Sequence, residues 1–131
     1  MKPLLSIIIP MYNSERYIVR CIESLRELKI LKEVIVVDDG SSDGSYDIAR
    51  KFASNGEIKL FHQENKGVSE ARNLGMDRCS GDVVVFVDSD DFIIGEGFQS
   101  MYNNFTLSKA EMVMGGVKIK FADQHIEVRL A

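Results

Sequence analysis

The chain has 131 residues, of which 45% are hydrophobic and 27% charged, with a formal net charge of −4. These values indicate one globular domain over residues 1–131, and the acidic balance argues against a nucleic-acid binder, which usually carries a basic patch. No apolar run approaches the ~20 residues that span a bilayer, and no signal-peptide pattern precedes the first apolar run. We therefore expect a cytoplasmic protein without a transmembrane segment, at most peripheral to the inner face of the membrane, with Cys21 and Cys79 as reduced thiols.

Four apolar runs indicate buried strands, at residues 4–9, 34–37, 58–61 and 83–87. Apolar side chains with helical spacing follow each run and indicate helices over residues 17–25, 48–53, 68–79 and 98–105. Asn13 or Ser14 is expected to cap the first helix with a side-chain oxygen. Strands and helices that alternate in this way predict an α/β fold with a mostly parallel sheet and right-handed crossovers.

The last segment of the chain has a different pattern. Apolar residues alternate with charged ones over residues 117–121 and 126–130, and Ala122-Asp123-Gln124 lies between the two stretches. This pattern predicts a C-terminal antiparallel β-hairpin with one apolar face. We expect another surface to cover that face, and a homodimer formed through the hairpin would do so.

Acidic residues close the fourth predicted strand, where Asp88-Ser89-Asp90-Asp91 places three carboxylates within four residues. Like charges this close raise one another's pKa values, and a bound cation would keep them ionised. Carboxylate oxygens suit Mg²⁺ or Mn²⁺. The alternative is a set of solvated loop acids, one of which caps a helix.

Polar residues also close the first and second strands, and the carboxyl ends of parallel strands are where ligands bind in open α/β sheets. Asp38 and Asp39 could accept hydrogen bonds from a nucleotide base or from a ribose hydroxyl, or they could belong to a turn before a helix cap. Tyr12, which follows Pro10, could stack on a flat base or could be a core tyrosine.

The segment from Asn65 to Gly75 leads into the third helix. Free amides at the helix start, together with Lys66 and Arg72, could hold a diphosphate. The alternative is an ordinary packed helix with surface charges. His62 and His125 have no partner pattern and are expected to be structural or exposed to solvent.

The ordered motifs PMYN (10–13), VDDGSSDGS (37–45), NKGVSEARNLG (65–75) and FVDSDD (86–91) closely resemble those of family 2 glycosyltransferases. The resemblance implies a GT-A fold, which is Rossmann-like with a strand order near 3-2-1-4. It also implies a nucleotide-sugar donor, usually a UDP-sugar, and a divalent metal, Mn²⁺ or Mg²⁺. The reaction would be an inverting transfer to a hydroxyl of a glycan or lipid-linked acceptor, in polysaccharide biosynthesis.

Matched motif by motif, the resemblance also implies roles for individual residues. Pro10 and Tyr12 would flank the base, Asp39 would pair with the base N–H with help from Asp38, Lys66 and Arg72 would contact the nucleotide or diphosphate, Asp88 and Ser89 would lie near the ribose, and Asp90 with Asp88 would hold the metal. The extra acid, Asp91, leaves the register of the DxD motif open.

The chain departs from the family pattern because it ends soon after residue 116, where the family normally continues. We therefore expect the donor-binding part of a larger catalytic domain, with no catalytic base in this chain and the general base beyond Ala131. Such a fragment would be weak or inactive alone. The alternative from another class is a non-catalytic module that binds a nucleotide or sugar nucleotide and lacks the acceptor half.

Overall fold

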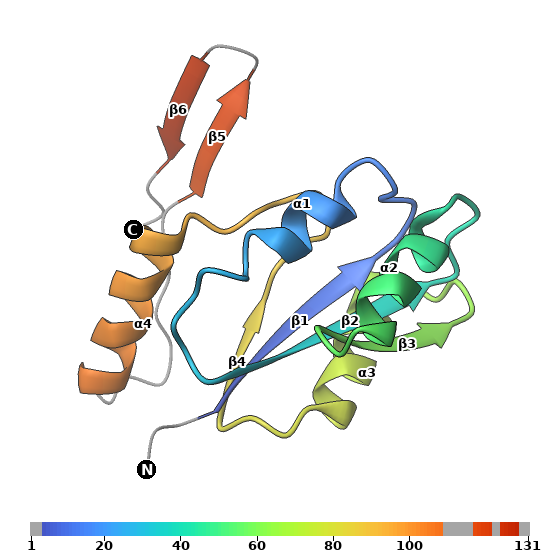
Figure 1. Cartoon of the computed structure of the whole chain (residues 1–131), viewed down its shortest axis with the longest axis horizontal. Coiled ribbons are helices and arrows are strands. Elements are labelled where there is room, and N and C mark those ends of the chain that lie inside the picture. Colours follow the sequence, from blue (N-terminus) through green and yellow to red (C-terminus); the bar gives the residue numbers. More distant parts are fainter. Residues whose placement is uncertain (1–3, 109–116, 122–123, 129–131) are drawn as a thin grey trace. The chain divides into compact units, whose positions relative to one another are not determined.

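The computed structural model describes residues 4–108, 117–121 and 124–128, and the chain divides into two compact units, residues 1–93 and 94–131 (Figure 1). In the first unit the elements are β1 (Leu5–Met11), α1 (Ile18–Glu23), β2 (Lys32–Asp39), α2 (Ser45–Ser54), β3 (Lys59–Gln63), α3 (Val68–Arg78) and β4 (Val83–Phe86). All seven follow the predicted order of strands and helices. The boundaries move by a few residues, as helix and strand ends commonly do.

The four strands form one parallel sheet in the order β3-β2-β1-β4, which confirms the predicted order. Ile8 of β1 pairs with Ile35 of β2 on one side and with Phe86 of β4 on the other. Every residue of β1 is buried, as expected for a strand with neighbours on both edges and helices on both faces. The carboxyl ends of all four strands therefore lie at one edge of the sheet.

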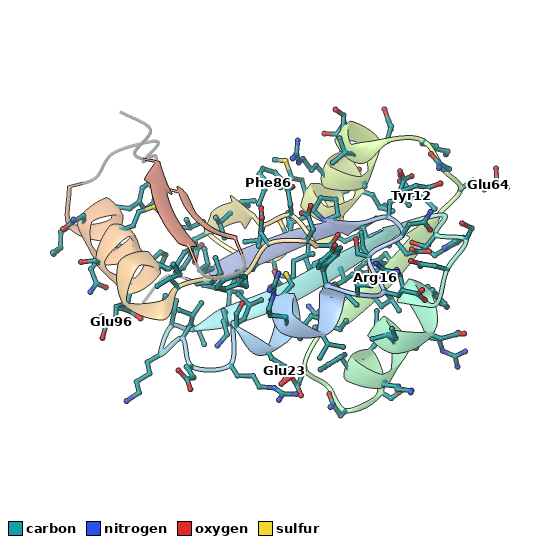
Figure 2. The ribbon with its side chains drawn as sticks, turned by 90° about the horizontal axis from the view of Figure 1, so that it is seen from above. Tyr12, Arg16, Glu23, Glu64, Phe86 and Glu96 are labelled. Atoms are coloured by element: carbon teal, nitrogen blue, oxygen red, sulfur yellow. The ribbon has the colours of Figure 1, made fainter. Side chains whose placement is uncertain are left out.

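Helices cover both faces of this sheet, with α3 on one face and α1 and α2 on the other (Figure 2). Beneath α3 the core contains Ile8, Ile35, Val37 and Ala71, all fully buried. Gly75 lets α3 come close to the sheet, since a Cβ at this position would lie 2.5 Å from Cγ2 of Ile8. Small side chains in α3 thus set the spacing between helix and sheet.

Strand β1 continues two residues past its predicted end, through Pro10 to Met11, while its pairing with β4 stops earlier. The last bond of that ladder runs from the Val87 N–H to the Ile8 carbonyl, at 3.0 Å. In a parallel ladder, alternate residues face the same neighbour. The next donor toward β4 would therefore be residue 10, and proline has no N–H. The two strands part at this point, which is the edge where ligands are expected.

The predicted side-chain cap of the first helix is wrong. Helix α1 begins after Tyr17 and has no side-chain cap; the Ser14 carbonyl accepts from the N–H groups of Tyr17 and Ile18 instead. Asn13 is in the left-handed region (φ 47°), where asparagine is one of the few tolerated side chains. The polar side chains of both Asn13 and Ser14 are used elsewhere, as described below.

At the opposite, amino-terminal edge of the sheet, the Glu33 carboxylate joins three strands and a loop. It accepts from Ser6 Oγ (2.6 Å) in β1, from Lys59 Nζ (2.8 Å) in β3 and from the Ser80 N–H (2.5 Å) before β4. Burial by itself raises the pKa of Glu33, but these hydrogen bonds outweigh it, so the net pKa lies below its ordinary value. This edge is therefore stabilised by an ionised carboxylate.

The second unit contains α4 (Gly95–Ser108), β5 (Val117–Phe121) and β6 (Gln124–Val128). Strands β5 and β6 pair antiparallel, with Ile119 opposite Ile126. The structure describes the backbone of these two strands but not their side chains, so the expected apolar face of the hairpin stays a prediction. In the part of the chain that the structure describes, no helix combines the length and apolar character needed to cross a membrane.

Candidate functional site

A cleft of about 440 Å³ opens at the carboxyl end of the sheet, where β1 and β4 part. The residues that line it come from the end of β1, the loop after it, the start of α3 and the loop after β4: Pro10, Tyr12, Asn13, Ser14, Tyr17, Val68, Arg72, Asp88, Ser89 and Asp90. Six of these are predicted site residues, namely Pro10, Tyr12, Arg72, Asp88, Ser89 and Asp90. Asp38, Asp39 and Lys66 lie outside the lining, and their roles as ligand contacts stay predictions.

One wall of the cleft combines an aromatic ring with a guanidinium group. Tyr12 follows the sheet edge, lines the cleft and is 48% exposed, so that its side chain is accessible to a ligand. Arg72 Nη2 donates to Asp88 Oδ1 at 3.3 Å, and the guanidinium lies 5.8 Å from the centre of the Phe86 ring. Arg72 Nε is buried and has no hydrogen-bond partner among the described residues. This wall can stack on a base and donate to an anion.

The acidic loop after β4 forms the other wall. One oxygen from each of Asp88, Asp90 and Asp91 lies within 4.8 Å of the others, and all three residues are exposed. Burial, then the charges of Asp90 and Asp88, raise the pKa of Asp91, while Arg20 opposes the rise. Clustered oxygen ligands that repel one another fit a hard divalent cation, which would neutralise the repulsion. Exposed acidic clusters also occur without a metal, so this geometry allows a metal site without demanding one.

Two buried hydroxyl groups fix the acidic loop to the loop after β1. Ser89, the residue between the first two acids, is 6% exposed, and its Oγ lies 2.5 Å from Ser14 Oγ. Ser14 Oγ also donates to the Tyr12 carbonyl at 3.1 Å. Because Ser14 has a single hydroxyl proton, the Ser89 hydroxyl is the donor in the pair. The two walls of the cleft therefore share one hydrogen-bond network.

Cys21 lies under the acidic loop and is fully buried. Its Sγ donates to the Asp88 carbonyl at 3.7 Å. Burial, then the charges of Asp91, Asp90 and Asp88, raise the pKa of this thiol to about 12. A thiol with so high a pKa is not nucleophilic near neutral pH. Cys21 and Cys79 are both free, as predicted.

The Asp39 carboxylate is 5% exposed and organises the loop before α3. Oδ1 accepts from Gln63 Nε2 (2.8 Å) and from the Lys66 N–H (2.7 Å), and Oδ2 accepts from the Gly67 N–H (3.0 Å). The backbone of Lys66, rather than its side chain, makes this contact. Gly40 lets the two loops meet, since a Cβ there would lie 2.7 Å from the Asn65 nitrogen.

The Asp38 carboxylate points away from that loop, because successive side chains of a strand lie on opposite faces. It is 1% exposed and accepts from the Ser41 N–H (3.3 Å) and from His62 Nδ1 (2.8 Å). Sequence reasoning gave His62 no partner. The missing signal was the β2–β3 register, which sets Asp38 directly opposite His62.

The sequence profile of Glycosyl transferase family 2 matches residues 6–130. The chain belongs to glycosyl transferase family 2. Among curated members of this family, it is 38% identical to the uncharacterized glycosyltransferase EpsJ of Bacillus subtilis over 98% of this chain and 38% of EpsJ. It thus has the GT-A-like sheet expected from its motifs.

Solved structures of glycosyltransferases share this fold. Staphylococcus aureus TarS residues 1–349 in complex with UDP matches 82% of this chain and 32% of the TarS chain, with 34% identity and a TM-score of 0.70. The Pyrobaculum calidifontis mannosyltransferase PcManGT, in complex with GDP-Man and Mn²⁺, matches 80% of this chain and 33% of its own, with a TM-score of 0.70; at 24% identity it shows the fold alone. Our 131-residue chain spans 27–39% of the length of the first curated relatives that it matches.

Proposed function

We propose that this chain holds the nucleotide-sugar donor and the divalent metal of an inverting glycosyltransferase, with a UDP-sugar as the donor. One observation carries the proposal: a single cleft brings together Tyr12, Arg72, Asp88 and Asp90, which come from three separate parts of the sequence. Membership of glycosyl transferase family 2 supports the reaction class. The TarS complex with UDP supports UDP as the first ligand to test.

Within the cleft, we assign Pro10 and Tyr12 to the base, whose flat face would lie on the exposed ring. Arg72 has a buried Nε–H that finds no partner among residues that the structure describes, and it would donate to the nucleotide or its diphosphate. Asp90 and Asp88 would hold Mn²⁺ or Mg²⁺, and the carboxylate cluster described above fits such a cation. A bound metal would act as a Lewis acid that stabilises the negative charge on the leaving diphosphate.

Asp38, Asp39, Lys66 and Ser89 would complete the donor site, with Asp39 pairing with the base N–H, Asp38 assisting it, and Lys66 contacting the nucleotide or diphosphate. Ser89 is fixed by Ser14, so it would orient the acids on either side of it. Each Asp39 oxygen already accepts a backbone N–H, yet a carboxylate has about four acceptor positions, so a further bond to a base N–H is compatible with the geometry.

An inverting transfer also needs a general base opposite the leaving group, and a site for the acceptor hydroxyl. We propose that the part of the longer relatives that this chain does not match supplies both, with a glycan or lipid-linked acceptor and a role in polysaccharide assembly. A cytoplasmic location, where nucleotide sugars would be available, and a homodimer through the C-terminal hairpin belong to the same proposal.

Isothermal titration calorimetry of the 131-residue chain tests the donor site. We expect UDP to bind in the presence of Mn²⁺ and to bind at least about tenfold more weakly in Asp90→Asn, a loss of about 1.4 kcal/mol. Asp77→Asn is the matched control, because Asp77 is exposed on α3 outside the cleft. UDP binding that is indifferent to both Mn²⁺ and Asp90→Asn would refute the metal assignment. GDP and dTDP are titrated in parallel: absence of binding by all three nucleotides would refute the donor site, and binding of GDP or dTDP alone would refute only the preference for UDP.

A second assay addresses the fragment. Transfer from a UDP-sugar by this chain is expected to be slow or absent, because no residue of the cleft is assigned as the general base. Turnover equal to that of a longer relative, measured side by side with the same donor and acceptor, would contradict the proposed division of the catalytic groups. UDP binding without turnover in any longer form would favour the non-catalytic binding module instead.

A further inference from the structure

The His62–Asp38 pair at the end of the sheet lies outside the cleft lining, and His62 has no role in the function proposed so far. Asp38 is almost fully buried at the end of β2, while His62, on the edge strand β3, has a side chain that is 52% exposed. His62 Nδ1 lies 2.8 Å from Asp38 Oδ2. A carboxylate only accepts hydrogen bonds, so Nδ1 carries the proton whether the imidazole is neutral or charged. The Tyr46 ring contacts the imidazole edge-on, at 5.6 Å between centroids, and fixes its orientation.

The other oxygen of Asp38 begins a chain of hydrogen bonds that ends at the cleft. Oδ1 accepts from the Ser41 N–H at 3.3 Å, and Ser41 Oγ accepts from the Asn13 N–H at 3.0 Å. Asn13 Oδ1 in turn accepts from the Ser42 N–H at 2.8 Å. Asn13 lines the cleft and directly follows Tyr12. The loop that carries the aromatic wall is thus bonded to the turn that Asp38 holds.

This chain of bonds matters because Asn13 has a backbone conformation that is costly without support. Its φ of 47° is in the left-handed region, which costs most L-residues about 1–2 kcal/mol and which asparagine tolerates when its polar side chain is hydrogen-bonded nearby. The bonds from residues 41 and 42 provide that support. They depend on the turn after β2, and the turn depends on a buried carboxylate whose Oδ2 has His62 as its donor.

We propose that His62 is a positioning residue for the nucleotide cleft. Its Nδ1–H holds the Asp38 carboxylate, which fixes the turn over residues 38–41 and through it the Asn13 backbone beside Tyr12. Loss of this donor leaves a buried acceptor unsatisfied, and the carboxylate then turns toward water and releases the Ser41 N–H. As far as it concerns the ligand, the inference rests on the proposed donor site.

Two substitutions of His62 separate the hydrogen bond from the bulk of the ring. His62→Asn places an amide N–H close to the position of Nδ1 and keeps the donor, but it loses the contact with Tyr46. His62→Phe keeps a ring beside Tyr46 and loses the donor. A role in packing alone predicts that His62→Asn is the more damaging variant, and the positioning role predicts the reverse.

Two readouts on the full chain test the prediction: calorimetry with UDP and Mn²⁺, and hydrogen exchange of the Ser41 and Asn13 amides without ligand. We expect His62→Phe to weaken UDP binding about fivefold or more and to accelerate both amides, and His62→Asn to stay within about twofold of wild type. Equal effects of the two variants, or a greater effect of His62→Asn, would overturn the proposal. If His62→Phe does not fold, His62→Leu, which also lacks the donor, replaces it.

The two readouts also keep the inference separate from the proposed function. If wild-type protein binds neither UDP nor GDP nor dTDP, the donor site is refuted, and the exchange rates alone decide whether His62 positions the loop. If UDP binds and the exchange rates of Ser41 and Asn13 are the same in His62→Phe as in wild type, the positioning role is refuted and the donor site is unaffected.

Discussion

Replacing Asp39 by asparagine tests whether this buried carboxylate organises the loop before α3. The two side chains have the same shape, but asparagine has one acceptor oxygen where aspartate has two. If that oxygen keeps the bonds from Gln63 and Lys66, the amide group faces the Gly67 N–H, and two donors meet. One charge-assisted hydrogen bond, of about 1.5–3 kcal/mol, is lost, and the two that remain weaken. We expect the free energy of unfolding to fall by about 2–3 kcal/mol.

Urea denaturation measures this loss, and for a urea dependence of about 1–3 kcal/mol per molar the midpoint falls by roughly 0.7–3 M. Hydrogen exchange locates the damage, which should appear first at the Lys66 and Gly67 amides. Asp77→Asn is the matched control, because it makes the same chemical change on an exposed part of α3 and should stay within about 0.5 kcal/mol of wild type. Equal midpoints for Asp39→Asn and Asp77→Asn would refute the reasoning.

Three further predictions follow from packing, ionisation and burial. Gly75→Ala places a Cβ 2.5 Å from a side chain of β1 and should destabilise by about 1–3 kcal/mol, less the helix propensity gained. Gly97→Ala, whose Cβ would meet no described atom within 4 Å beyond its own helix backbone and chain neighbours, should not destabilise; equal urea midpoints for the two variants would contradict this. The pKa of Glu33 is lowered on folding, so the stability that its ionised carboxylate contributes is present above the unfolded pKa of about 4.3 and is lost as the pH falls through the lower folded pKa. The free energy of unfolding should therefore decrease less steeply toward pH 3 in Glu33→Gln than in wild type, and an equally steep decrease would contradict this prediction. A thiol reagent at pH 8 should modify Cys79 in native protein but reach Cys21 only after unfolding, and fast modification of two thiols would show that Cys21 is accessible.

The architecture was predictable from the sequence because two local signals identify its strands: each is an apolar run, and polar residues follow directly after it. Short β-branched runs such as residues 34–37 favour strands buried on both faces, and helices between them favour parallel neighbours. Parallel strands bring their carboxyl ends to one edge, so Tyr12 and Asp90 were expected to share a site, and they line one cleft.

The partners of individual side chains could not be predicted in the same way. Asp38 and Asp39 were expected to contact the nucleotide, and that stays a prediction; what the sequence did not indicate is that each carboxylate also holds a different loop. The partner of Asp38 depends on a register between strands that no local pattern encodes. Asn13 or Ser14 was expected to cap a helix, but the left-handed turn at Asn13 directs its side chain to the neighbouring loop.

Pro10 has a consequence for how the acidic loop is attached. With an N–H at this position, the ladder could add a bond to the Val87 carbonyl, and β4 would continue alongside β1 through the space that the cleft occupies. Because proline ends the hydrogen-bond ladder there, the backbone of residues 88–91 does not pair with the sheet. Hydrogen bonds with the side chains of residues such as Ser14 and Arg72 hold this loop instead. The entrance of the cleft can therefore adapt to different ligands through changes in a few side-chain contacts, while the strands beneath it keep their register.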